Sequence, residues 1–293
     1  MRRAVVLLLA GIAIAGCGAE DAEPPFEPSE PSDPGLIHVH GLGRNPADGA
    51  LIVATHTGLF RVEGQGEPPT RVADNYQDTM GFTVIGPDHF LGSGHPGSVP
   101  DDPPFLGLIE SRNAGKRWRP ISLRGKVDFH VLEAQGRTVY GFGSDFETRE
   151  ARFLRSRDGG RAWDQLTPPE PLVGLAIDPE DARRVVALGE DRGHMSRDGG
   201  ETWRPLDLAG GFVTWTREVG VVSVDLEGNV RRADEPDQEW ERAGRIGTAP
   251  AAFDSADDEL LVATHDGRIM SSRDRGASWQ ELLGVGSSRV RRG

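Results

Sequence analysis

Cysteine, tyrosine and basic residues are scarce in this sequence. The 293 residues include one cysteine and two tyrosines, and 33 Lys and Arg stand against 46 Asp and Glu, a formal net charge of −13. A single thiol excludes an intramolecular disulfide, so a folded domain here must rely on its core. The negative charge argues against nucleic acid as a partner and against adsorption to anionic lipid.

A long hydrophobic run is also missing. Arg2 and Arg3 precede an apolar stretch that begins at Ala4–Ala10 and is too short for a confident membrane span. The segment Ile14-Ala15-Gly16-Cys17 resembles a bacterial lipobox, in which cleavage before the cysteine leaves its thiol to be lipidated. We therefore predict a lipoprotein signal peptide over residues 1–17, with Cys17 as the lipidation site. The expected location is the outer side of the bacterial cell membrane, or the periplasm, and the alternative is an ordinary signal peptide with a chance cysteine.

Residues 18–35 contain five prolines and six acidic residues but no basic one. Such a segment cannot bury enough apolar surface to fold, and it should act as a stiff tether. The remaining domain boundaries follow from the pattern of strands and turns: a folded domain over residues 36–283 and a C-terminal tail over residues 284–293.

From Leu36 onward no sustained helical period occurs, and one short motif recurs instead. Ser196-Arg197-Asp198-Gly199-Gly200-Glu201-Thr202-Trp203 comes back four times in more or less altered form, and its tryptophans stand 45, 40, 37 and 39 residues apart. A fixed period of this size indicates an array of equal structural units. The repeat positions are Ser111, Asn113, Gly115 and Trp118; Ser156, Asp158, Gly160 and Trp163; Ser196, Asp198, Gly200 and Trp203; Asp234 and Trp240; and Ser272, Asp274, Gly276 and Trp279.

The motif indicates a hairpin turn in which Ser ends one strand and Asp accepts hydrogen bonds from nearby backbone N–H groups. Gly supplies the positive φ, and Trp opens the next strand and anchors the blade by its burial. The pattern Ser-x-Asp-x-Gly-x-x-Trp resembles the Asp-box, or BNR repeat, of sialidases, sortilin-like receptors and photosystem-assembly propellers. That resemblance implies a β-propeller whose repeat turns join the third and fourth strands on the face away from the active site.

We predict an all-β fold, a propeller of six blades with four antiparallel strands each. Six units in residues 36–283 average about 41 residues, which suits a propeller blade. Seven blades are the alternative, although the chain lacks obvious residues for the seventh. We expect a monomer.

If the strands are assigned to six blades in this way, most of the histidines fall on one face of the propeller. The first strand of each blade should line the channel, with its start on the face opposite the repeat turns, here called the top. Seven residues fall at strand starts or in loops on that face and are the predicted ligand-binding set: His38, His40, His56, Met80, His95, His130 and His265. His89 turns to the opposite face.

A metal ion is one ligand that this set predicts. On a strand, His38 and His40 should project on the same side, about 7 Å apart. Together with His130 they form the predicted metal core, suited to copper or zinc. The alternative is structural, because strand-end histidines also hydrogen-bond to a neighbouring backbone.

The sequence argues against a sialidase. Neither Tyr76 nor Tyr140 has the surroundings of a nucleophile, and the Phe/Tyr-Arg-Ile-Pro motif is absent. Carboxylates expected near the top face, including Asp78 and Asp128, leave another glycoside hydrolase as an alternative, although acidic loops usually serve solvation.

Four longer sequence segments extend the family resemblance over residues 36–283. His38-Val39-His40-Gly41, Ala54-Thr55-His56-Thr57-Gly58, Met80-Gly81-Phe82-Thr83 and Ser93-Gly94-His95-Pro96 are similar to those of a group of bacterial Asp-box lipoproteins labelled glycosylhydrolase-like. The label implies no substrate. The sequence thus predicts a lipid-anchored propeller that binds a ligand or partner (a protein, a glycan or a metal ion) at a histidine-rich channel mouth.

Overall fold

The computed structural model describes residues 33–97 and 103–284, and these residues form strands and turns without a helix. The predicted signal peptide with Cys17, most of the tether and most of the C-terminal tail lie outside the described residues. No helix in the described part of the chain is long and apolar enough to cross a membrane.

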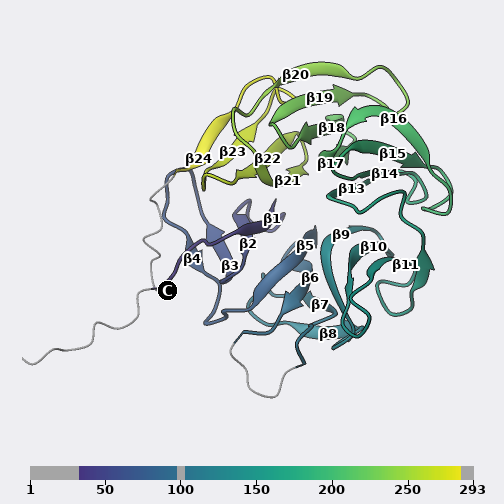
Figure 1. Cartoon of the computed structure of the whole chain (residues 1–293). Coiled ribbons are helices and arrows are strands. Elements are labelled where there is room, and N and C mark those ends of the chain that lie inside the picture. The colour runs from purple at the N-terminus through teal and green to yellow at the C-terminus, as the bar shows by residue number, and fades with distance from the viewer. Residues whose placement is uncertain (1–32, 98–102, 285–293) are drawn as a thin grey trace, which may run out of the picture. The chain divides into compact units, whose positions relative to one another are not determined.

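Within these described residues, twenty-four strands form six antiparallel sheets of four, which are the predicted six blades (Figure 1). The first three blades consist of β1 (Val39–Arg44), β2 (Leu51–Thr55), β3 (Gly58–Val62) and β4 (Thr70–Arg71); β5 (Asp78–Gly86), β6 (His89–His95), β7 (Leu108–Ser111) and β8 (Arg119–Ser122); and β9 (Val127–Gln135), β10 (Thr138–Asp145), β11 (Ala151–Ser156) and β12 (Asp164–Leu166). The last three consist of β13 (Gly174–Ile177), β14 (Val185–Leu188), β15 (Arg192–Ser196) and β16 (Arg204–Ala209); β17 (Gly211–Thr216), β18 (Gly220–Asp225), β19 (Asn229–Ala233) and β20 (Glu241–Arg245); and β21 (Pro250–Ala256), β22 (Glu259–Thr264), β23 (Ile269–Ser272) and β24 (Gln280–Leu283).

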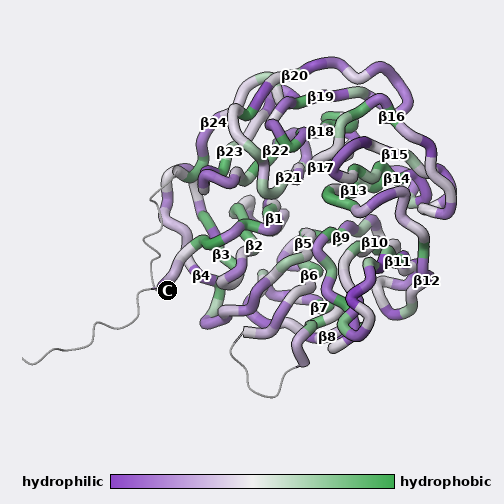
Figure 2. The backbone as a smooth tube through the Cα atoms, viewed as in Figure 1, coloured by the Kyte–Doolittle hydropathy of each residue, from purple (hydrophilic) through white to green (hydrophobic). Residues whose placement is uncertain are grey.

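The first strand of each blade is the innermost. Strands β1, β5, β9, β13, β17 and β21 each contact the first strand of the next blade, and β21 contacts β1, so the ring closes. The inner strands β2, β14 and β22 are wholly buried, whereas the outer strand β16 is mostly exposed; Figure 2 shows the same contrast between the hydrophobic β14 and the hydrophilic β20. The core therefore lies between blades.

The repeat turn has the predicted hydrogen bonds. Ser156 Oγ donates to Asp158 Oδ1 (2.8 Å) and accepts from Gly160 N (2.8 Å), while Asp158 Oδ1 accepts from the backbone N–H of Arg161 and Ala162 (2.9 Å each). Gly160 has a φ of 83°, in the left-handed region that favours glycine. Equivalent bonds recur in the turns after β7, β15 and β23.

The repeat tryptophans join neighbouring blades, which differs from the predicted burial within one blade. Trp163 of blade 3 donates from Nε1 to Ser122 Oγ of blade 2 (2.9 Å) and packs beside Leu108 of that blade. Trp203 of blade 4 packs near Phe153 of blade 3, with ring centroids 6.0 Å apart. Because the rings of Trp163 and Trp203 lie at the seam between two blades, both stay half-buried.

The last residues of the predicted tether contact blade 1. Arg71 Nε donates to Asp33 Oδ2 (2.9 Å), and Thr57 Oγ1 donates to the carbonyl of Gly35 (2.6 Å). The Arg71 guanidinium in turn stacks 4.0 Å from the ring centroid of Tyr76. Residues 33–35 are thus held against the blade.

Candidate functional site

Four of the six channel-lining strands have a bulge at the same level near the top face. The pairing register of β1, β5, β9 and β21 with the next strand skips one residue, which is His40, Met80, His130 or Ala251. A bulge leaves its extra residue unpaired and redirects the side chain. Blades 1, 2 and 3 therefore present His40, Met80 and His130 from equivalent positions around the channel mouth.

The glycines that follow two of these bulges allow the blades to approach closely. A Cβ on Gly41 would lie 2.9 Å from Phe82 Cβ of blade 2, and one on Gly81 would lie 2.7 Å from the carbonyl oxygen of Phe129 in blade 3. Larger residues would push the first strands apart. In the dipeptides His40-Gly41 and Met80-Gly81, the glycine therefore allows the bulged residues of adjacent blades to lie near one another.

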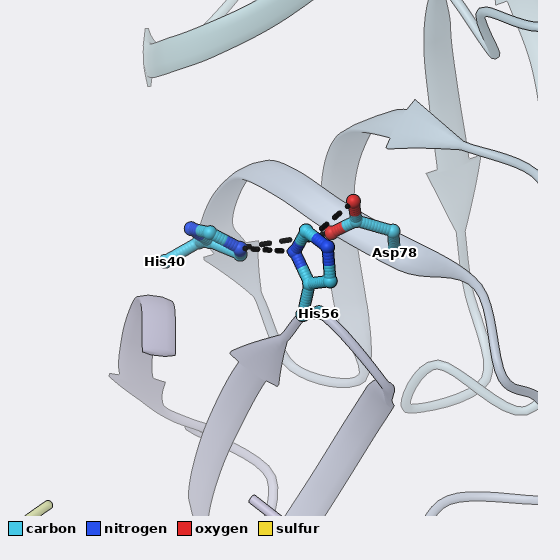
Figure 3. A group of neighbouring side chains, drawn as sticks. All are labelled: His40, His56 and Asp78. Atoms are coloured by element: carbon cyan, nitrogen blue, oxygen red, sulfur yellow. Dashed lines mark hydrogen bonds and ion pairs between the residues drawn. The ribbon is translucent and has the colours of Figure 1, made fainter. Parts of the chain in front are cut away.

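Three side chains converge at this mouth: His40 from β1, His56 from the β2–β3 hairpin and Asp78 from the start of β5 (Figure 3). His40 Nε2 lies 3.2 Å from His56 Nδ1 and 3.6 Å from Asp78 Oδ1, and His56 Nδ1 lies 3.3 Å from Asp78 Oδ2. Ligands 2.0–2.1 Å from a tetrahedral zinc ion stand about 3.3 Å apart. The spacing of the three groups therefore fits one metal ion.

Asp78 is the buried member of this triad. Its side chain is 12% exposed, and its Oδ1 atom is buried without a hydrogen-bond partner. A buried carboxylate oxygen that lacks a partner is costly unless a cation is bound to it. His56, by contrast, is 52% exposed, so solvent reaches the site from the top face.

Burial also keeps His40 neutral. The pKa of His40 is lowered to about 4: burial is the main cause, the charge of Asp78 opposes it, and the nearby imidazoles add to the lowering. An imidazole must be neutral to bind a metal through its lone pair. His40 is thus a ready ligand at neutral pH.

A chain of ion pairs and hydrogen bonds runs from Asp78 through His95 and Asp128 to His130. Its Oδ2 atom lies 3.1 Å from His95 Nδ1, and His95 Nε2 lies 3.4 Å from Asp128 Oδ2, which is also 2.9 Å from His130 Nε2. The hydrogen bond to Asp78 raises the pKa of His95, and burial opposes it. Hydrogen bonds of this kind orient a ligating carboxylate.

The predicted metal core of His38, His40 and His130 does not meet at one point. His38 has a φ of 50°, and the bulge at His40 interrupts the strand, so the simple alternation behind that prediction does not hold. The His38 ring lies 5.7 Å from the His56 ring, and His130 bonds to Asp128 instead. His56 and Asp78 take their places beside His40.

Other predicted residues are separate from the triad. In the described part of the chain, Met80 Sδ makes no polar contact with it, and neither does the exposed His265, whose N–H donates to the carbonyl of Ala249 (3.1 Å). His89 bonds to Glu110 Oε1 (2.7 Å) at the opposite end of its blade. His265 occupies the position of His56 in the equivalent hairpin of blade 6.

The sequence interpretation named Asp78 only as one of several acidic residues. Alignment of the strand starts shows why it belongs to the site: two residues before each bulge stand His38, Asp78 and Asp128. The signal is therefore the pattern Asp-x-Met and Asp-x-His at equivalent points of two blades, which His38-x-His40 repeats in the first.

One of the two tyrosines, Tyr140, is inaccessible as a nucleophile. Tyr140 is fully buried in β10, and its hydroxyl donates to the carbonyl of Ala182 (2.9 Å). Asp78 and Asp128, the candidate glycosidase carboxylates, both contact His95. They thus belong to the histidine network.

A larger cavity opens at the other end of the channel. It has a volume of 1150 Å³ and is lined by residues of all six blades, among them Arg44, Thr83, Glu133, Trp215 and Asp254. A narrow neck of 70 Å³, lined by His40 and His130 at one end and Glu133 and Asp254 at the other, lies between it and the histidine mouth.

No protein-family model matches the chain. The vacuolar protein sorting/targeting protein 10 of Aspergillus fumigatus is 33% identical over 69 residues, which are 22% of this chain and 5% of that protein. The chain therefore spans only a small part of the curated relatives that it matches.

Solved structures are similar in fold. A gluconolactonase, XC5397 from Xanthomonas campestris, matches with a TM-score of 0.58 and 14% identity, covering 80% of this chain and 84% of that one. YCF48 bound to a D1 peptide matches with a TM-score of 0.51 and 16% identity, covering 87% and 84%. At such identities the likeness shows the propeller fold alone, which is consistent with binding a ligand or partner. Membership of the Asp-box family stays a prediction.

Proposed function

We propose that the channel mouth binds a divalent transition metal ion through His40, His56 and Asp78. The observation that carries the proposal is the spacing of the three groups: His40 Nε2 and His56 Nδ1 lie 3.2 Å apart, and each lies 3.3 to 3.6 Å from one carboxylate oxygen of Asp78, whose buried Oδ1 has no hydrogen-bond partner. Three donors close enough to share one ion are more than a hydrogen-bonded histidine pair requires.

The donor set favours Zn²⁺, with Cu²⁺ second. Two imidazole nitrogens and one carboxylate oxygen suit either ion, and the near-tetrahedral spacing suits zinc. A thioether would favour Cu(I), but Met80 makes no polar contact with the triad among the described residues. Three protein ligands would leave a fourth position for an external ligand, and the 52% exposure of His56 shows that solvent reaches the site.

Calorimetric titration of chelator-treated protein with Zn²⁺, Cu²⁺ and Ni²⁺ tests this function. Replacing His40, His56 or Asp78 (His40→Ala, His56→Ala, Asp78→Asn) should weaken Zn²⁺ binding at least 10- to 100-fold. His265→Ala is the matched control, because His265 occupies the same hairpin position as His56 in another blade, and it should change affinity less than twofold. His89→Ala, on the opposite face, should behave likewise.

Two outcomes would return these histidines to a structural role. One is no heat above buffer for any of the three ions. The other is an equal loss of affinity in His56→Ala and His265→Ala. Thermal unfolding of each variant without metal separates a lost ligand from a lost fold.

The cellular setting of this metal site is also a proposal. The lipobox-like segment that ends at Cys17 supports an exported propeller anchored by lipid outside the cell membrane. Held there, the open coordination position would meet extracytoplasmic ligands or partners. YCF48, which was solved with a D1 peptide, supports a peptide as a partner for such a propeller.

A further inference from the structure

The larger cavity, at the end of the channel opposite the histidines and here called the lower cavity, is lined by two acidic side chains that the metal site does not use. Glu133 on β9 and Asp254 on β21 both lie three residues after a bulge, so they stand at the same level of the channel. Their blades, the third and the sixth, are opposite one another in a ring of six. Both line the neck as well as the cavity.

These two half-buried carboxylates lack the cationic partners that the buried Glu110 and Glu259 have. Glu110 is bound by Arg112 (2.7 Å), and Glu259 is bound by Arg44 (2.9 Å). In the described part of the chain Asp254 accepts one hydrogen bond, from Ser255 N (2.7 Å), and neither Asp254 nor Glu133 is paired with a basic side chain. An unpaired acid in a channel costs stability unless something else binds it.

The charges around the pair make the cavity a cation site. Six carboxylates and two guanidinium groups line it, and the two guanidinium groups, of Arg44 and Arg273, are already paired with Glu259. Burial raises the pKa of Glu133 well above its usual range, and the charge of Asp254 raises it further. The first effect is lost hydration and the second is repulsion between two acids, and a cation bound between them would offset both.

The neighbouring blades carry small residues at the level of the two acids. The residue equivalent to Asp254 in blade 1 is Gly43, where a Cβ would already lie 3.4 Å from Asp254 Oδ2, and in blade 2 it is Thr83. Apolar walls from Ile177 and Trp215 flank the same cavity. A cavity of 1150 Å³ that combines these acidic groups with some apolar wall is large enough for a small organic ligand.

We propose that the lower cavity binds an organic cation, with its ammonium or guanidinium group between Glu133 and Asp254. A bare metal ion suits the pair less well. The only group of three or more His, Cys, Asp or Glu ligand atoms close enough to share an ion among the described residues is the triad at the mouth. This site is independent of the metal site, because it lies beyond the neck on the opposite face.

Titration with agmatine and spermidine at 150 mM salt, on chelator-treated protein, tests the proposal. Each probe carries the cationic groups in question, and the buried Trp215 in the cavity wall offers a fluorescence readout beside calorimetry. We expect saturable binding that weakens at least tenfold in Glu133→Gln and in Asp254→Asn. Asp258→Asn is the control, since this acid lines the same cavity but is 61% exposed and paired with Arg273, and it should change affinity less than twofold.

Three results would overturn the proposal. The first is that neither agmatine nor spermidine binds at 10 mM. The second is that the double variant, Glu133→Gln with Asp254→Asn, binds the amines as tightly as the parent protein does. The third is that Ca²⁺ binds between the two acids and the amines do not. Because Glu133→Gln removes a repulsion, it should not unfold the protein, and a thermal midpoint at or above that of the parent keeps the binding comparison valid.

Discussion

At the residue scale, three side chains form the proposed metal site: His40 and His56 of blade 1 and Asp78 of blade 2. The top-face placement of His40 and His56 followed from their positions at strand ends. The choice of His38 and His130 as their partners assumed regular strands, whereas His38 is in a left-handed conformation and His40 is bulged. Bulges depend on how neighbouring strands pair, which one strand's sequence does not report.

A pH prediction belongs to the channel acids. Burial raises the pKa of Asp254 to about 7, against 3.8 for the ordinary side chain. The folded protein therefore holds a proton that the unfolded chain has lost, so its stability should fall as the pH rises from about 4 to about 7. Asp254→Asn removes this penalty and should stabilise the protein at pH 8 relative to the parent by more than about 1 kcal/mol.

Urea unfolding of parent and Asp254→Asn at pH 4 and pH 8 measures the effect. The difference between the two proteins should be small at pH 4 and should favour the variant at pH 8. Asp258→Asn, an exposed acid of the same cavity, controls for the loss of one negative charge. The same difference at both pH values would mean that Asp254 titrates normally.

At the element scale, the repeat turn was predictable because its hydrogen bonds are local. Ser, Asp and Gly of each turn bond within four residues of one another, so the motif alone specifies the hairpin. The destination of the tryptophan was not predictable in this way. Trp163 and Trp203 contact the preceding blade, and that contact depends on how the blades are arranged.

The loss of stability caused by each tryptophan substitution should depend on how deeply the ring is buried, and not on how closely its repeat matches the motif. Trp240, in the most degenerate repeat, is 9% exposed and donates to the carbonyl of Pro236 (3.1 Å), whereas Trp163 and Trp203 are half-buried. We expect Trp240→Ala to cost about 3–5 kcal/mol and Trp163→Ala or Trp203→Ala about 2–3 kcal/mol. Urea midpoints measure the order, and a larger loss for Trp163→Ala than for Trp240→Ala would contradict it.

At the scale of the whole molecule, the period of the tryptophans predicted the blade count, and six blades are confirmed. The lower cavity was not predictable, because Glu133 and Asp254 are 121 positions apart in the sequence and only ring closure sets them opposite one another. Their common offset of three residues from a bulge becomes visible once the blades are aligned.

Export is a prediction about the whole chain. If residues 1–17 direct lipidation, Cys17→Ser should leave uncleaved precursor, or release a soluble form where another peptidase cuts. Fractionation of cells that express the parent and the variant measures the membrane-bound share. Equal partition of both proteins into the membrane fraction would rule out the lipid on Cys17 as the anchor.

Ring closure provides the last test, because the first and last blades meet without sharing a strand. Their seam includes backbone and side-chain bonds from Gly66 N to Leu282 O (3.1 Å) and from Gln65 Nε2 to Glu281 O (3.1 Å). It also includes the two-pronged pair of Arg44 with Glu259, at 2.9 and 3.2 Å. Burial would raise the pKa of Glu259, but its bonds with Arg44 hold it below the usual value.

Arg44→Met should therefore open the seam. It leaves a carboxylate that is 5% exposed with Arg273, 3.4 Å away, as its remaining cationic partner, so we expect a cost of about 2–4 kcal/mol. Arg61→Met, which breaks an ion pair with the exposed Glu63 within blade 1, should cost less than about 1 kcal/mol. Adding Glu259→Gln to Arg44→Met should restore part of the lost stability, because the buried carboxylate charge is then removed. If Arg44→Met and Arg61→Met shift the urea midpoint equally, the pair does not hold the ring closed.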